Sequence, residues 1–179
     1  REKGIIYSIN SWSGYFYMHT NKGAEDFKID KTNDVSFVKW ESYIPAKDET
    51  LIGSLTFLNN WIIRSEVTNA LGKIFVKNLK NEKEEELIFS DEKVFDSVVS
   101  LVQKDKNTDL VHISYSTPKT QSRVYLYNLK SKEKKLVKEQ IIPSGHNPDD
   151  YIVERFDCDS HDGRKVPITI TRHKKTNID

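Results

Sequence analysis

The stretch KIFVKNLK at residues 73–80 returns fifty positions later as RVYLYNLK at residues 123–130, in the same register. Upstream, Trp61–Ser65 corresponds to Leu110–Ser114 at nearly the same offset. These runs are short, alternate in polarity and are rich in aromatic and β-branched residues, which is the pattern of β-strands. The sequence therefore predicts a repeated unit of about fifty residues that is built from strands.

A fainter third copy precedes these two. The segment Tyr15–His19 is followed, after an Asn-Lys-Gly turn, by a short strand at Phe27–Ile29, and the chain opens with a predicted strand over Gly4–Ile9. A repeat of about fifty residues with about four short strands is typical of a β-propeller blade. Three such units fit between residue 1 and about residue 140. Closed propellers need at least about four blades, so we interpret the chain, which starts at Arg1 without Met, as part of a longer polypeptide.

The pattern changes after residue 140. Turn-forming residues fill positions 143–150, and Tyr151–Asp159 and Lys165–Thr171 then read as two strands of one long hairpin. The Asp162-Gly163 pair is predicted to occupy its tip, because Asp-Gly is a strong two-residue hairpin signal. The fold class is therefore all-β, with propeller blades over 1–142, a linker over 143–150 and the start of a second domain over 151–179.

Composition narrows the function classes. The formal net charge of +1 provides no field that would attract nucleic acid, and no apolar run is long enough to span a membrane. Cys158 is the only cysteine, so no intramolecular disulfide can form and a reducing, cytoplasmic location is expected. We interpret Cys158 as a structural thiol, with a catalytic thiol as the alternative.

Motifs for catalysis and for cofactors are missing from the sequence. No Gly-x-Ser-x-Gly element is present; Ser13 and Ser54 each neighbour a single glycine. The acidic run Asp157–Gly163 fails the calcium-loop pattern, because its glycine is seventh and no Glu stands at position twelve. His112 and His161 have no partner at zinc-ligand spacing. We therefore predict no catalytic residues, no metal and no cofactor in this chain.

Aromatic residues at alternating strand positions have two interpretations. Packing between blades accounts for them first, and a platform for sugars or peptides is the alternative. The residues concerned are Trp12, Tyr15, Phe16, Tyr17, Trp40 and Trp61.

The order of motifs in the second half resembles a known family. The motifs are Ser114–Thr117, Ser122–Leu129, Leu136–Gln140, Tyr151–Arg155 and Asp162–Thr169. Their succession is similar to the junction between propeller and catalytic domain in the prolyl oligopeptidase family, and most similar to its oligopeptidase B (protease II) members. The segment from Tyr15 to Ile29 also fits, so the resemblance covers nearly the whole chain. One departure is Lys119–Gln121, where many members have Thr-Thr-Pro.

The resemblance implies the last about three blades of a seven-bladed propeller, followed by the first hairpin of an α/β-hydrolase domain. Oligopeptidase B-like members hydrolyse short peptides after Arg or Lys. The family's catalytic Ser, Asp and His would lie beyond Asp179, so this chain is expected to be inactive alone and to act as a lid. Its expected partners are that catalytic domain and short peptides. The alternative is a stand-alone propeller-type interaction module, against which the hairpin over 151–171 argues.

Overall fold

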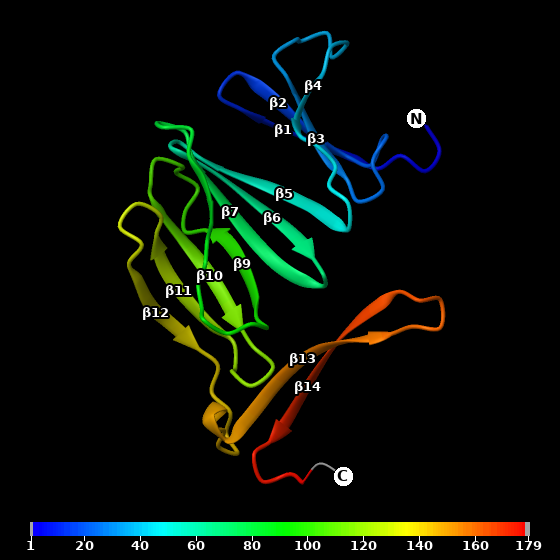
Figure 1. Ribbon diagram of the computed structural model, residues 1–179. Coiled ribbons are helices and arrows are strands. Elements are labelled where there is room, and N and C mark those ends of the chain that lie inside the picture. The colour runs from blue at the N-terminus through cyan, green and yellow to red at the C-terminus, as the bar shows by residue number, and fades with distance from the viewer. Residues whose placement is uncertain (1, 178–179) are drawn as a thin grey trace. The chain divides into compact units, whose positions relative to one another are not determined.

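The computed structural model describes residues 2–177; Arg1 and Asp179, which the sequence interpretation used as chain ends, lie outside the described residues. The described residues form three four-stranded antiparallel sheets and one two-stranded sheet (Figure 1). The first sheet contains β1 (Tyr7–Trp12), β2 (Tyr15–Thr20), β3 (Lys28–Thr32) and β4 (Glu41–Ile44). The second contains β5 (Thr50–Leu58), β6 (Trp61–Thr68), β7 (Leu71–Asn78) and β8 (Glu84–Glu86). The third contains β9 (Asp96–Leu101), β10 (Leu110–Ser116), β11 (Arg123–Asn128) and β12 (Lys134–Glu139).

The internal repeat corresponds to equivalent strands of successive sheets. Residues 73–80 and 123–130 fall on β7 and β11, the third strands of their sheets. The matching runs at 61–65 and 110–114 fall on β6 and β10, the second strands. In each sheet the strands are paired in the order in which they occur along the chain, which is the meander of a propeller blade. The predicted all-β fold with three blade-like units is confirmed.

The chain divides into two compact units, one over residues 1–69 and 73–87 and the other over 70–72 and 88–179. In the first unit, the first and second sheets share a core of Tyr17, Ile29, Ile52, Phe57 and Ile62. Two hydrogen bonds also join these sheets, since Nε2 of His19 donates to the Ile52 carbonyl over 2.7 Å and the Ile52 amide donates to the Asp26 carbonyl. The two sheets of this unit are therefore packed face to face.

In the second unit, Phe89 covers one face of the third sheet. Its ring lies 5.4 Å from the ring of Tyr115, 5.0 Å from that of Tyr125 and 6.1 Å from that of Tyr127. Val111 and Ile113 lie at alternate positions of β10, on the same face as Tyr115, and both are fully buried. The alternating pattern of the sequence therefore identifies the inner face of this sheet correctly.

Two predicted strands begin or end elsewhere. The strand predicted over Gly4–Ile9 is wrong at both ends: Gly4 has a φ of +83° in a turn, and β1 starts at Tyr7. The apolar run Glu86–Phe89, which follows the first copy of the repeat, also reads as a strand in the sequence, but β8 (Glu84–Glu86) ends at Glu86. The Leu87 amide still donates to the Ile74 carbonyl over 2.7 Å, and Phe89, two residues later, packs on the third sheet.

The hairpin is formed by β13 (Tyr151–Asp159) and β14 (Lys165–His173), paired over their whole length. The Asp162-Gly163 pair lies in the loop at the tip, as predicted, but it is not the central pair of a two-residue turn. The Gly163 amide donates to the Ser160 carbonyl, so His161 and Asp162 are the central turn residues and Gly163, at a φ of +78°, follows them. This is the longer turn in which glycine occupies the left-handed position. Asp162 instead accepts the Arg164 amide hydrogen bond, which lowers the pKa of its carboxyl group.

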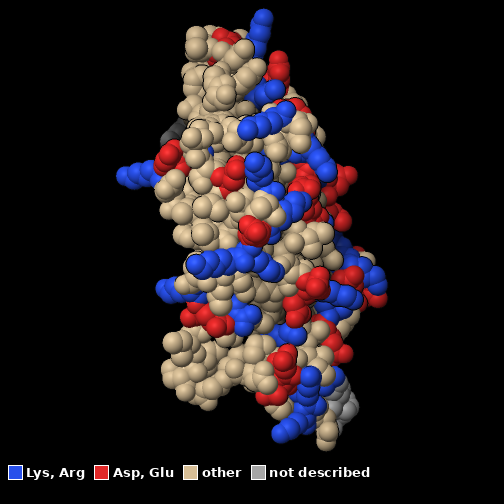
Figure 2. Space-filling view, turned by 90° about the vertical axis from the view of Figure 1, so that its left-hand side faces the viewer, with Lys and Arg blue, Asp and Glu red and all other residues tan. Residues whose placement is uncertain are grey.

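The linker contains a single turn of 3-10 helix, Pro148–Asp150, capped by the side chain of Asn147. Among the described residues no helix is long and apolar enough to cross a membrane. Figure 2 shows basic and acidic side chains interspersed over the face that it displays. The domain boundaries at residues 142 and 150 stay predictions.

Candidate functional site

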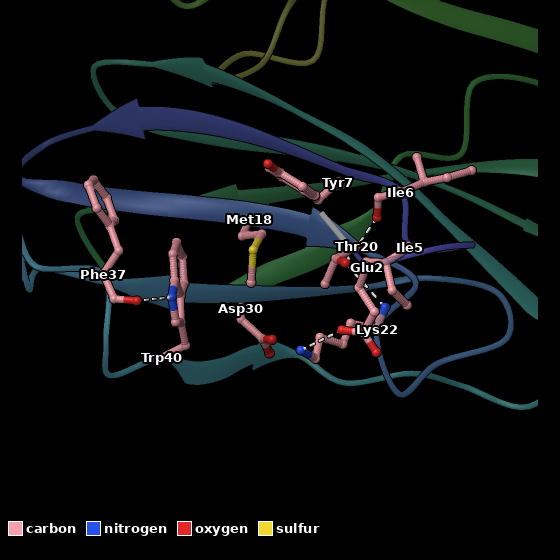
Figure 3. Close-up of a pocket in the computed structure, with 10 residues that line it drawn as sticks. All are labelled: Glu2, Ile5, Ile6, Tyr7, Met18, Thr20, Lys22, Asp30, Phe37 and Trp40. Carbon is pink, nitrogen blue, oxygen red and sulfur yellow. Dashed lines mark hydrogen bonds and ion pairs between the residues drawn. The ribbon is translucent and has the colours of Figure 1, made fainter.

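A hollow of about 900 Å³ lies on the first sheet (Figure 3). Phe37 and Trp40 lie at one end of it and Glu2 and Lys22 at the other, with Met18 between them. The lining is completed by Ile5, Ile6, Tyr7, Thr20 and Asp30. We refer to these ten residues as the first-sheet hollow.

Strand alternation determines which side chains line this hollow. Met18 is paired with Asp30 across β2 and β3, and Tyr7 is paired with Thr20 across β1 and β2, so all four belong to one face of the sheet. Tyr17, one position from Met18, points to the other face and into the core shared with the second sheet. The first sheet is therefore covered on one face only by the described residues.

Local hydrogen bonds build the aromatic end of the hollow. Asp34 accepts hydrogen bonds from the amides of Ser36 and Lys39, and the bonds from Ser36 lower the pKa of the Asp34 carboxyl group. Phe37 has a φ of +56°, and its carbonyl accepts the Trp40 indole N–H over 3.0 Å. The loop between β3 and β4 thus holds two aromatic rings beside the strand face.

The polar end is closed by bonds between the N-terminal segment and the turn after β2. Thr20 Oγ1 donates to the Ile6 carbonyl, and Lys22 forms an ion pair with Glu2 at 2.9 Å. Asp30 pairs with Lys28 at 3.0 Å, so its carboxylate has a partner. The charged side chains among the described residues that line the hollow, Glu2, Lys22 and Asp30, are therefore all paired.

Large apolar side chains on this face remain in solvent. Ile6 is 63% exposed, Tyr7 56% and Ile9 45%. Contiguous apolar surface of this kind usually marks a site of protein contact. The first-sheet hollow is therefore suited to packing against an apolar surface.

A buried ionic cluster stabilises the second sheet. Arg64 donates through Nε to Glu66 over 2.8 Å and through both terminal nitrogens to Glu84. Lys47 donates to Glu66 as well, and the Arg64 guanidinium lies 4.7 Å from the centre of the Phe75 ring. Burial lowers the pKa of Arg64, but its bonds to Glu84 and Glu66 outweigh this and raise it above its usual value. Since each charge is paired, we assign the cluster a structural role.

Among the described residues, the serines and histidines named above are not brought together into a catalytic triad. Ser13 has a φ of +50° in the turn between β1 and β2, and Ser54 is exposed on β5. At the hairpin tip the hydroxyl oxygen of the half-buried Ser160 lies 3.4 Å from Nδ1 of His161, which is exposed. Among residues 2–177 there is no cluster of three metal-ligating side chains, and Cys158 is a free, half-buried thiol.

The aromatic residues are divided between the core and the surface. Tyr17 and Trp61 are buried, and the Trp12 ring is stacked on Phe57 at 5.9 Å, as blade packing predicts. Trp40 instead lines the first-sheet hollow, and Tyr15 is exposed. For these two residues, packing between blades stays a prediction. Sequence reasoning missed the hollow itself, because its lining comes from four separate segments.

Comparison with known proteins follows this geometry. The family model described as prolyl oligopeptidase, N-terminal β-propeller domain, matches residues 1–140. Dipeptidyl aminopeptidase BI of Pseudoxanthomonas mexicana is 25% identical over 178 residues, an alignment that covers 97% of this chain and 24% of that protein.

Solved structures give the same fold. Oligopeptidase B from Trypanosoma brucei, in a closed form with covalently bound antipain, matches with a TM-score of 0.86 and 24% identity over 99% of this chain and 26% of its own. Oligopeptidase B from Leishmania major matches with a TM-score of 0.79 and 18% identity over 98% of this chain and 26% of its own. The chain thus spans about a quarter of the length of these relatives.

Proposed function

This chain belongs to the prolyl oligopeptidase N-terminal β-propeller family, and on that premise we propose that it is the non-catalytic lid segment of an oligopeptidase B-like serine peptidase. The parent enzyme would hydrolyse short peptides after Arg or Lys. The observation that carries the proposal is the family match over residues 1–140, together with the three meander sheets in the same residues. We also propose a cytoplasmic location, which the lone Cys158 supports.

Two features support a steric role. The sequence has no Gly-x-Ser-x-Gly element, and the structure gathers no nucleophile with a base and an orienting carboxylate among the described residues. A propeller that contributes no chemistry can still exclude large substrates by covering the approach to a catalytic face. The lid would thereby select peptides by size.

The first-sheet hollow supports a position inside a larger propeller. The opposite face of the same sheet is already covered by the second sheet through Tyr17 and Phe57. A further sheet of the same type, with apolar residues at alternating positions, would cover Met18 and Tyr7 in the corresponding way. We therefore propose a neighbouring blade as the occupant of the hollow.

The hairpin supports a second domain. Phe156, Val166 and Ile170 share one of its faces and are each more than two-fifths exposed. An isolated two-stranded hairpin is only marginally stable in water. We propose that this face packs against the catalytic domain, which would be the principal partner of the chain.

The second candidate is a stand-alone interaction module, which the exposed hollow favours because Phe37, Trp40 and Met18 could receive a partner protein directly. The experiment that separates the two candidates uses the complete native polypeptide that contains this segment. It compares cleavage of a short Arg-containing peptide with cleavage of the same sequence inside a folded protein.

We expect hydrolysis after Arg in the free peptide and none in the folded protein, because the lid would admit only short chains. Equal cleavage of both substrates would contradict the lid role. If neither substrate is hydrolysed, the result would instead favour the interaction module.

A further inference from the structure

Four hydrogen bonds hold the loop between β10 and β11. The hydroxyl oxygen of Thr117 accepts hydrogen bonds from the amides of Lys119 and Thr120, over 3.2 Å and 2.9 Å. The backbones of Thr117 and Thr120 also exchange two hydrogen bonds, of 3.1 Å and 3.2 Å. Because four bonds determine its conformation, the loop presents the Lys119 carbonyl in one direction.

That carbonyl binds the linker. Nε2 of His146 lies 2.6 Å from the Lys119 carbonyl oxygen, across 27 positions of sequence. A carbonyl oxygen only accepts, so Nε2 must carry the hydrogen and donate it. Gly145, at a φ of +78°, closes a turn onto the Ile142 carbonyl just before His146. This turn directs the imidazole back toward the third sheet.

The loop is anchored to the third sheet and to the segment before it. Lys119 Nζ pairs with Glu92 at 2.9 Å, and the hydrogen bond to Glu92 raises the pKa of Lys119. Gln121 and Arg123 both donate to the same carboxylate oxygen of Glu139 at the end of β12. The carbonyl that accepts the hydrogen bond from His146 therefore belongs to a loop that is bonded both to the third sheet and to the segment before it.

From His146 the contacts continue into the base of the hairpin. The imidazole ring lies 5.1 Å from the ring of Tyr151, the first residue of β13, and Tyr151 meets His173 edge-on at 5.4 Å. The Lys174 amide donates to the Asp150 carbonyl over 2.8 Å, which joins the end of the hairpin to the linker. Linker and hairpin base thus form one packed assembly with His146 at its edge.

We propose that the hydrogen bond from His146 to the Lys119 carbonyl is a latch that holds the linker, residues 143–150, on the third sheet and so fixes the base of the hairpin. One consequence rests on the lid role proposed above: movement of a following domain at this linker would first have to break the latch. The latch itself is a property of this chain and needs no peptidase activity. Its failure and the failure of the lid role are therefore distinguishable.

The test is native-state hydrogen exchange of the complete chain with His146→Phe. Phenylalanine keeps a ring against Tyr151 and removes the N–H donor. We expect the amides of Gly145 and Asp150 to exchange roughly three- to tenfold faster, the loss expected for one hydrogen bond in a locally opening segment. Exchange at the wild-type rate would overturn the proposal.

Two controls keep the test specific. His161→Ala, at the exposed hairpin tip, should leave the exchange rates of the Gly145 and Asp150 amides unchanged. If this variant speeds their exchange as much as His146→Phe does, the latch is overturned. Protection of the Ile113 amide in β10 reports whether the fold is intact. If His146→Phe does not fold, nitrogen NMR of the wild-type imidazole decides the matter, because the latch requires a hydrogen-bonded, slowly exchanging Nε2–H and a rapidly exchanging one would contradict it.

Discussion

Replacing Arg64 with methionine is expected to lower the free energy of unfolding by about 3 kcal/mol, the scale seen when one partner of a buried ion pair is removed. Arg64 and Glu66 are 4% and 3% exposed, and the substitution leaves Glu66 with Lys47 as its remaining partner among the ion pairs shown. Methionine preserves most of the apolar contact with Phe75, so the loss reports the charge. Chemical denaturation measures this loss of unfolding free energy, provided that the dependence of the free energy on denaturant concentration (the m-value) is the same in both proteins.

The matched control is Lys73→Met in the same sheet. Lys73 pairs with Glu86 at 3.9 Å, and both side chains are about two-fifths exposed, so this change should cost less than about 1 kcal/mol. The double variant Arg64→Met/Glu66→Leu should recover much of the loss, because it removes both buried charges. A single Arg64→Met variant as stable as the control would contradict the structural role of the cluster.

Replacing Gly53 with alanine is expected to destabilise the chain by about 3 kcal/mol, because a β-carbon there has no room. It would lie 2.2 Å from Ser65 Oγ and 2.8 Å from the Ser65 carbonyl oxygen. Gly53 stands where the register of β5 and β6 shifts, between Ile52 and Leu55. To remove these clashes, β5 and β6 would have to move apart. The loss of stability is measured as a lower midpoint temperature of thermal unfolding.

Gly72→Ala is the matched control, since no atom lies within 4 Å of its would-be β-carbon. It should change stability by about 1 kcal/mol or less. Adding Ser65→Ala to Gly53→Ala removes the hydroxyl contact but keeps the carbonyl contact, so rescue should be partial. If Ser65→Ala restores the full stability, or if Gly53→Ala alone does not lower it, β5 and β6 are not as close as the structure places them.

The sheet pattern could be predicted from sequence because propeller strands repeat. The runs at 73–80 and 123–130 carry the same alternation, and alternation directly reports which side of a strand is buried. Their placement on equivalent strands β7 and β11 follows from that periodicity alone. The hairpin over 151–173 was predictable for the same reason, but its turn was not, because Asp-Gly occurs in turns of several lengths.

Contacts between distant segments could not be predicted. Arg64 and Glu66 lie two positions apart on one face of β6, and their burial depends on Glu84 and Lys47, which come from other segments and pair with them. The first-sheet hollow likewise needs the loop with Trp40 and the segment with Ile6 to meet over Met18. No local sequence pattern indicates such contacts between distant segments, and they become visible only in the folded chain.

The central claim is that this chain is the non-catalytic lid of a serine peptidase. It is tested most directly by capturing the native polypeptide from source cells with an antibody to residues 2–177, labelling it with a fluorophosphonate serine probe and mapping the labelled peptide by intact and peptide mass. We predict a polypeptide several times longer than 179 residues, labelled at a serine in a Gly-x-Ser-x-Gly peptide outside this segment. A captured polypeptide without label, or with the label on a serine of this segment such as Ser13 or Ser54, would contradict the account.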